Sequence, residues 1–184
     1  MTYKIFGYEN KMPEKAFAEL YNIMEYSFPE DERRDRDEQR NIAENRAFGV
    51  LTAEENGAVI GFMTFWQLSG CVYIEHFAIS RGLRGNGLGT EMIKQFCERF
   101  CGCGIVLEAE PPALGEIAAR RVGFYSRLGF FLNDFPYRQP PYRQDGNPVE
   151  LKIMSLRKPL SEDEFRDVKR LLYADVYHIH EENF

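Results

Sequence analysis

The sequence predicts an α/β domain with a central sheet that is mixed but mostly antiparallel and is flanked by helices. Two observations predict it. Strand-like segments at residues 48–54, 58–68 and 72–79 follow one another across short turns, which is typical of an antiparallel meander. A glycine-rich loop at 81–89 then leads through a helix into an apolar segment at 105–109. A strand–helix–strand unit of this kind joins parallel strands, so one parallel pair is expected inside the sheet.

The remaining elements follow from the spacing of apolar residues and from capping residues. Residues 31–45 are predicted to form a helix whose most polar part, 32–36, we interpret as a face exposed to solvent. Ser161 and Glu164 form a capping box for a last helix at 161–177. The other predicted elements are a strand at 3–8, helices at 13–28 and 116–128, strands at 130–132 and 149–156, and a long loop at 133–148.

Length and composition place the chain among globular proteins. Its 184 residues are 44% hydrophobic and 28% charged, so a single domain over 1–184 is expected, with a core at about 3–156. The formal net charge of −6 and the lack of a lysine or arginine block argue against a nucleic-acid partner. No apolar run approaches a membrane span, and the first residues lack the apolar stretch of a signal peptide, so a cytoplasmic protein is expected.

The four cysteines are expected to be reduced thiols, as in most cytoplasmic proteins. Cys97, Cys101 and Cys103 are close in sequence, but they lack a Cys-x-x-Cys pair and no histidine lies nearby. We therefore predict no metal site and interpret these residues as small side chains at a helix end.

The segment Arg84–Thr90 carries the clearest functional pattern. Its sequence, Arg-Gly-Asn-Gly-Leu-Gly-Thr, has glycines at alternate positions, which lets the backbone turn tightly and approach a ligand closely. Backbone N–H groups at the start of the following helix are suited to phosphate anions, and Arg81 and Arg84 add positive charge. The segment lacks the lysine of a Walker loop, and its glycine spacing departs from the dinucleotide fingerprint, which disfavours ATP and NAD.

Two motifs resemble the GNAT superfamily, the GCN5-related N-acetyltransferases. Arg84-x-x-Gly87-x-Gly89, which follows a strand ending in Phe77-Ala78-Ile79, is similar to the acetyl-CoA motif of that family. Phe124-Tyr125-x-x-x-Gly129-Phe130 is similar to the family's ending of the fourth helix. The order of predicted elements resembles the GNAT fold from about residue 3 to residue 156, which is nearly the whole chain.

The resemblance implies a fold in which the parallel strand pair is splayed, with acetyl-CoA as the co-substrate. Backbone groups of Phe77, Ala78 and Ile79 would bind the pantetheine arm. Tyr125 matches a tyrosine that the family commonly places near the thioester sulfur. Ala118 stands where many relatives have a cofactor-contacting asparagine. The N–H groups expected to hold the pyrophosphate are those of Arg84, Gly85, Asn86, Gly87, Leu88 and Gly89, with the Thr90 hydroxyl adding a contact.

Proton transfer identifies the candidate catalytic side chains. A primary amine with a pKa of about 10.4 is almost entirely protonated at pH 7, so a base must remove a proton before or during attack. Glu75, just before the cofactor motif, and Glu108, at the end of the parallel neighbour strand, are the candidate bases, and each could instead be structural. His76 follows Glu75, so on a regular strand only one of the two faces the acceptor. The Tyr125 hydroxyl is the candidate acid for the leaving thiolate.

These observations predict an enzyme that transfers the acetyl group of acetyl-CoA to a primary amine by direct attack. The acceptor is a small molecule or a peptide or protein, and the loop at 135–143, polar and aromatic at once, is interpreted as a wall of its site. Arg120 and Arg121 either reach an anionic group or form a solvated helix face. The helix at 161–177 offers a surface for a homodimer. A non-catalytic acyl-CoA-binding regulatory module and a nucleotide-binding protein are the alternatives; turnover with amines, or competition by NAD or ATP, would distinguish them.

Overall fold

The computed structural model describes residues 1–143 and 146–179 and contains an eight-stranded sheet in the order β1-β2-β3-β4-β5-β8-β6, with β7 pairing with β8 off this path. One strand pair is parallel and the sheet is otherwise mostly antiparallel, which confirms the predicted fold class. The strands are β1 (Thr2–Gly7), β2 (Phe48–Glu55), β3 (Ala58–Leu68), β4 (Cys71–Ile79), β5 (Gly104–Ala109), β6 (Phe130–Leu132), β7 (Tyr137–Gln139) and β8 (Val149–Leu156). The helices are α1 (Glu14–Ser27), α2 (Arg36–Asn41), α3 (Leu88–Arg99), α4 (Glu116–Arg127) and α5 (Glu162–Leu171), with short helical turns η1 (Glu30–Glu32), η2 (Ile42–Glu44), η3 (Arg81–Leu83), η4 (Pro112–Leu114) and η5 (Leu172–Val176).

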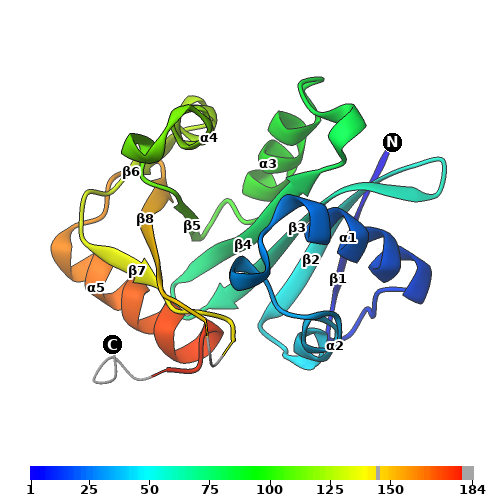
Figure 1. Cartoon of the computed structure of the whole chain (residues 1–184), viewed down its shortest axis with the longest axis horizontal. Helices are drawn as coiled ribbons and strands as arrows, with labels where there is room; N and C mark the ends of the chain where they lie inside the picture. The colour runs from blue at the N-terminus through cyan, green and yellow to red at the C-terminus, as the bar shows by residue number, and fades with distance from the viewer. Residues whose placement is uncertain (144–145, 180–184) are drawn as a thin grey trace. The chain divides into compact units, whose positions relative to one another are not determined.

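The chain forms two compact units (Figure 1). The first contains Met1–Gln67 and Ile74–Phe100, and the second contains Leu68–Tyr73 and the chain from Cys101 onward. Strand β4 contributes residues to both units. The single domain expected from the sequence stays a prediction.

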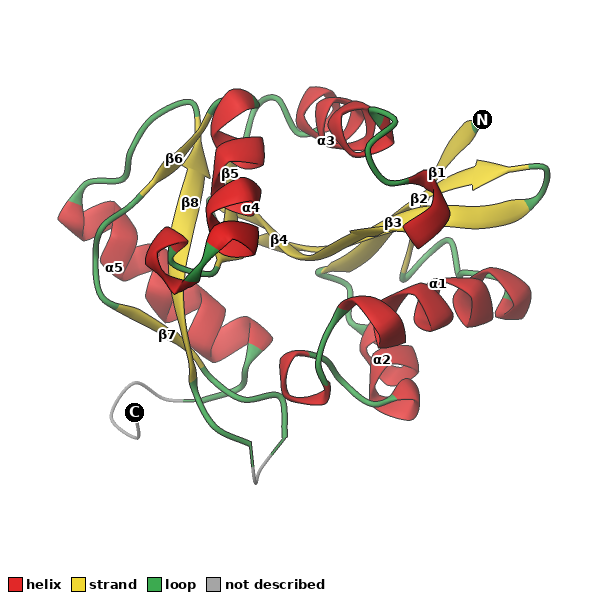
Figure 2. Cartoon of the chain, turned by 45° about the horizontal axis from the view of Figure 1, so that its top comes forward, coloured by secondary structure: helices red, strands yellow, loops and turns green. Residues whose placement is uncertain are grey.

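In the first unit, helices cover both faces of the sheet, α1 and α2 on one face and α3 on the other (Figure 2). Phe65 of β3 packs against α3, with its ring centre 5.1 Å from that of Phe96. The next residue, Trp66, is fully buried, and its ring lies beneath the Arg34 guanidinium that precedes α2. Because successive strand residues face opposite sides, β3 carries apolar side chains on both faces and reads as a nearly continuous apolar run.

In the second unit, α4 and α5 lie on opposite sides of β5 and β8 (Figures 1 and 2). Ser161 accepts a hydrogen bond from the Glu164 amide and Glu164 returns one to Ser161, so the predicted capping box is confirmed. The helix then widens into η5, a π-helical turn in which the Tyr177 amide donates to the Leu172 carbonyl. The predicted helix at 161–177 is therefore an α-helix followed by one wider turn.

The predicted helix at 31–45 is wrong in two respects. The segment breaks into η1, α2 and η2, and Arg33 and Arg34 are only 8% and 7% exposed rather than solvated. Arg33 donates to the Tyr21 hydroxyl at 2.8 Å, and Arg34 forms an ion pair with Glu75. Both arginines are buried because they bind polar partners inside the protein, and the charge pattern of the segment does not reveal these partners.

A short strand, β7, lies inside the region predicted to be a loop at 133–148. It pairs antiparallel with Val149–Leu151 of β8. Its pattern of burial, with Tyr137 and Gln139 buried and Arg138 exposed, is that of a strand, but three residues between prolines are too few to be recognised. The buried Tyr137 ring is not available as an open wall, and Gln144 and Asp145 of this loop lie outside the described residues.

The register of β1 and β2 provides a packing test at a pair of opposed glycines, Gly7 and Gly49. A Cβ atom built on Gly49 would lie 2.4 Å from Cζ of Phe65, whereas one on Gly7 meets nothing closer than 3.4 Å. Gly49→Ala should lower the free energy of unfolding by about 1–3 kcal/mol, because Phe65 is held by its aromatic neighbours and cannot move freely. Urea unfolding measures this, and Gly7→Ala, the control, should change much less.

Candidate active site

The glycine loop turns sharply before α3. Gly85 and Gly87 have φ values of 84° and 82°, a conformation that side-chain-bearing residues adopt at a cost. A Cβ atom built on either glycine would meet nothing within 4 Å. No described residue therefore fills the space beside the loop backbone, and a ligand could approach it closely.

The backbone N–H groups of residues 85–90 make no hydrogen bond to the described residues. Gly87 is the N-cap of α3, and among residues 1–143 and 146–179 no side chain caps this helix. The first N–H groups of a helix need partners, and together with the helix dipole they favour an anion. A pyrophosphate group fits this arrangement of donors, and the sequence predicts the pyrophosphate at the same loop.

The two arginines of the loop are used locally rather than held out toward a ligand. Arg84 donates from Nε to the Ile79 carbonyl at 2.9 Å and from Nη2 to the Ser27 hydroxyl at 3.0 Å. Arg81 donates to the Tyr26 carbonyl and lies over the Tyr26 ring. Arg84 thus fixes the end of β4 against the end of α1. It also occupies the Ile79 carbonyl, one of the backbone groups expected to bind pantetheine.

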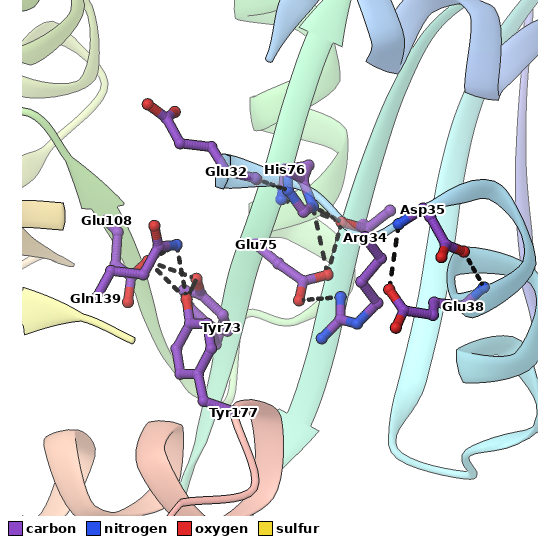
Figure 3. Close-up of polar contacts among 11 residues, drawn as sticks. Glu32, Arg34, Asp35, Glu38, Tyr73, Glu75, His76, Glu108, Gln139 and Tyr177 are labelled. Atoms are coloured by element: carbon purple, nitrogen blue, oxygen red, sulfur yellow. Dashed lines mark hydrogen bonds and ion pairs between the residues drawn. The ribbon is translucent and has the colours of Figure 1, made fainter. Parts of the chain in front are cut away.

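Glu75 is buried and ion-paired, with Nη1 of Arg34 2.7 Å from its Oε1 (Figure 3). Its side chain has no exposed surface, and Oε2 accepts from the Thr64 hydroxyl at 3.2 Å. Burial alone would raise the pKa of Glu75, but the Arg34 charge and the contact with His76 outweigh it and hold the pKa well below its ordinary value. Such a carboxylate is weakly basic, and this favours the structural interpretation of Glu75.

His76 does not face away from Glu75 as a regular strand would require. Its Nδ1 lies 3.4 Å from Oε2 of Glu75, and both side chains contact the Thr64 hydroxyl. The other ring nitrogen, Nε2, is 2.9 Å from the Glu32 carbonyl (Figure 3). The expected alternation fails here because both side chains find polar partners near the start of α2.

Glu108 lies on β5 among hydroxyl and amide donors of the second unit. Its Oε2 accepts from the Tyr73 hydroxyl at 2.8 Å, the Tyr177 hydroxyl at 2.9 Å and Gln139 Nε2 at 2.9 Å (Figure 3). Its Oε1 accepts from the Tyr137 hydroxyl. These contacts of Glu108 come from phenols and an amide, whereas Glu75 contacts a guanidinium.

Tyr125 lies on α4 with 7% of its surface exposed and packs edge-to-face on Phe130. Burial raises the pKa of its hydroxyl to about 12, so the group is protonated at neutral pH. No described residue is a hydrogen-bond partner of this hydroxyl.

Two arginines lie earlier in α4. Arg120 pairs with Glu116, and Arg121 donates to Glu110 at 2.6 Å. These exposed pairs fit a solvated helix face better than an anion site.

Two further features concern metals and membranes. Cys71, Cys97, Cys101 and Cys103 form no disulfide with one another. Over the described part of the chain, no group of three or more His, Cys, Asp or Glu residues is arranged to hold a metal ion. Among the same residues, no helix has the length and apolar character needed to cross a membrane.

Comparison with known proteins identifies the family. A family model described as "Acetyltransferase (GNAT) family" matches residues 15–130, the greater part of the chain and the whole glycine loop. The chain belongs to the GNAT acetyltransferase family. This confirms the resemblance seen in Arg84–Gly89 and supports acetyl transfer in general terms. A comparison with curated proteins gave no match.

Solved structures agree with the family. A GNAT-family protein from Bacteroides thetaiotaomicron is 27% identical, with a TM-score of 0.87 over 98% of this chain and 100% of the other. The ribosomal-protein-S18-alanine N-acetyltransferase from Escherichia coli is 16% identical, with a TM-score of 0.62 over 88% and 97% of the two chains. An aminoglycoside 6′-N-acetyltransferase complexed with coenzyme A is 13% identical, with a TM-score of 0.63 over 88% and 100%. The last two likenesses concern the fold alone.

Sequence reasoning missed the partners of both glutamates. The charge pattern predicts a solvated segment that includes Arg34, and nothing in a mixed-charge segment distinguishes a buried arginine from its exposed neighbours. The partners of Glu108 left a weak signal, because Tyr137 and Gln139 have the two-residue spacing of one strand face. Tyr177 comes after α5 and a π-helical turn. The wider turn shifts the spacing of side chains, so α-helical periodicity does not predict where Tyr177 points.

The Arg34–Glu75 pair generates a stability prediction. Glu75→Gln leaves the buried guanidinium without its counter-charge, so the free energy of unfolding should fall by about 3–5 kcal/mol at pH 7. Folding lowers the pKa of Glu75 from 4.5, so its charge stabilises the protein fully above about pH 4.5 and progressively less below. The gap between wild type and variant should therefore narrow on acidification, as measured by urea unfolding.

Glu44 is the matched control, because its ion pair with Lys11 is 2.6 Å long but the two side chains are 60% and 65% exposed. Glu44→Gln should change stability by less than about 1 kcal/mol at any of these pH values. Equal effects of the two substitutions would contradict the importance given to the buried pair.

Proposed function

We propose that the protein is an N-acetyltransferase that uses acetyl-CoA to acetylate a primary amine. The observation that carries the proposal is a row of backbone N–H groups at residues 85–90 that no described residue accepts from, at the start of a helix and beside two glycines with positive φ. Family membership supports acetyl transfer, and one structural relative was solved in complex with coenzyme A.

In this proposal the loop N–H groups bind the pyrophosphate and the last residues of β4, Phe77–Ile79, bind the pantetheine arm through their backbone. Donors fixed by the fold do not have to reorganise when the anion binds, so little free energy is lost in ordering them. Arg84 supports the site indirectly, since its bonds to Ile79 and Ser27 hold the strand end and the loop in place.

The proposed reaction is direct attack. The acceptor ammonium gives one proton to a base, and the nitrogen lone pair then forms a bond to the thioester carbonyl carbon. The C–S bond breaks, with its electron pair left on sulfur. Tyr125 protonates the sulfur and regains a proton from the second N–H of the new amide through solvent. The products are the acetylated amine and CoA thiol, with one net proton released.

We propose Glu108 as the base in preference to Glu75. The carboxyl group of a base must keep its hydrogen-bond partners after it takes up a proton. Arginine has five donors and no acceptor, so a protonated Glu75 would lose its main partner, Arg34, and leave that charge buried. Three phenols and one amide donate to Glu108, and a hydroxyl can accept as well as donate, so these phenols can also serve the protonated acid.

The cofactor site is tested with Gly87→Val. Acetyl-CoA at a hundred times its dissociation constant should stabilise the wild type by about 2.7 kcal/mol, measured as a rise in melting temperature. The variant should lose this response, because the valine side chain fills the open space beside the loop. An undiminished rise in the variant would contradict the assignment of the loop.

Gly57→Val is the control for strain. Gly57 has a φ of 77° and nothing within 4 Å of a built Cβ atom, but it lies in the β2–β3 turn. Both variants should lose similar intrinsic stability, while only Gly57→Val keeps the acetyl-CoA response. Thiol release from acetyl-CoA across a panel of primary amines then tests turnover, and binding without any turnover would favour an acyl-CoA-binding regulatory module.

The proposed acid is tested with Tyr125→Phe. The hydroxyl has no described partner, so the variant should keep its melting temperature and its response to acetyl-CoA. Loss of general acid catalysis should lower kcat by about 10²–10⁴-fold. A thioester with a more acidic thiol should be less sensitive, since it needs less help in leaving. A fall in kcat of less than about threefold would reject the acid role.

A further inference from the structure

Tyr73, Gln139 and Tyr177 donate to Oε2 of Glu108 within the second unit (Figure 3). The Tyr137 hydroxyl donates to Oε1 and completes one hydrogen-bonded cluster. These partners come from β4, from β7 and from the residue that follows η5. The two hydroxyls that reach Oε2, those of Tyr73 and Tyr177, are 3.1 Å apart. Three oxygens therefore lie at mutual hydrogen-bonding distance, 2.8, 2.9 and 3.1 Å.

This triangle of oxygens can satisfy Glu108 in both protonation states. When the carboxylate is charged, each phenol donates its single proton to Oε2, and the contact between the two phenols carries no proton. When Oε2 is protonated, it donates to one phenol, that phenol donates to the other, and the second donates back to Oε2. Each oxygen of the ring then donates one proton to the next oxygen, while Gln139 Nε2 still donates to Oε2 and to the Tyr177 hydroxyl. A proton can therefore be taken up without breaking the cluster.

We propose that Tyr73 and Tyr177 are positioning residues that allow Glu108 to accept the proton of the acceptor amine and to release it again. The inference rests on the proposed acetyl transfer and on Glu108 as its base. In the step concerned, R–NH3⁺ and the Glu108 carboxylate become R–NH2 and the carboxylic acid. The acid then returns its proton to solvent.

Two further observations support this role. Burial, and then the charge of Glu108, raise the pKa values of Tyr137 and Tyr177 well above the ordinary value of 10, so both stay protonated donors. Gln139 Nε2 also donates to the Tyr177 hydroxyl at 2.8 Å, which fixes the orientation of that phenol.

The backbone also places Tyr177 in an unusual way. It follows η5, in which the bond from the Tyr177 amide to the Leu172 carbonyl spans five residues. Such π-helical turns are rare and are frequent at functional sites, because one extra residue in the turn re-aims the side chains that follow. Here the turn precedes the phenol that reaches Glu108.

The test compares Tyr177→Phe in two backgrounds. In the otherwise wild-type enzyme it should lower kcat about tenfold to a hundredfold and leave the KM for acetyl-CoA unchanged, because a hydrogen bond to a charged group is lost. In the Glu108→Gln background it should lower kcat by less than about twofold, since the residue acts through Glu108. Tyr73→Phe should behave in the same way and serves as the second variant if Tyr177→Phe folds poorly.

Tyr173→Phe is the matched control. Tyr173 is a phenol of the same C-terminal segment, is 2% exposed and donates at 2.6 Å to the backbone carbonyl of Arg138. It should lower the melting temperature and keep kcat. An equal loss of kcat from Tyr177→Phe in both backgrounds, or none in the wild-type background, would overturn the inference while leaving acetyl transfer intact. A wild-type protein that acetylates no amine would overturn the proposed function, and the inference with it.

Discussion

A carboxylate that leaves water must meet either a positive charge or several hydrogen-bond donors, and this requirement shapes both units of the protein. Glu75 meets it with the Arg34 guanidinium, and Glu108 meets it with phenols and an amide. The first solution draws the segment before α2 into the interior. The second gathers the ends of β4, β7 and the C-terminal helix around one side chain.

The two solutions have different chemical properties. A guanidinium partner is permanently charged, so it fixes one protonation state of its carboxylate and adds to stability only while that state persists. Phenol partners are neutral and can reverse the direction of their hydrogen bonds. Burial of a charge therefore produces a structural ion pair in one unit and, in our proposal, a site of reversible protonation in the other.

Much of this protein could be predicted from its sequence. The meander, the crossover helix and the glycine loop follow from turn residues and apolar spacing, and the loop with the Tyr125 motif was enough to indicate the family. These features are local, because a few adjacent residues dictate them. The burial of Arg33 and Arg34 could not be predicted, since it depends on partners such as Tyr21 and Glu75 that are distant in sequence.

The candidate bases were found from their positions on strands, but their environments were not. A strand position shows that a side chain can face a site, but it does not show which residues surround it. The partners of Glu108 come from positions up to 69 residues away, and a π-helical turn lies before one of them. The periodicity of apolar residues along the sequence does not show which distant residues meet around one side chain.

The place of Tyr177 in the chain also has a consequence for protein synthesis. It leaves the ribosome 69 residues after Glu108, when β5 and α4 have already been made. The nascent chain therefore carries a glutamate whose surroundings are completed only after β5, α4 and β8 have been made. The proposed proton site thus forms only after the strands that carry Glu108 and its other partners, and a chain released before Tyr177 would hold those strands without it.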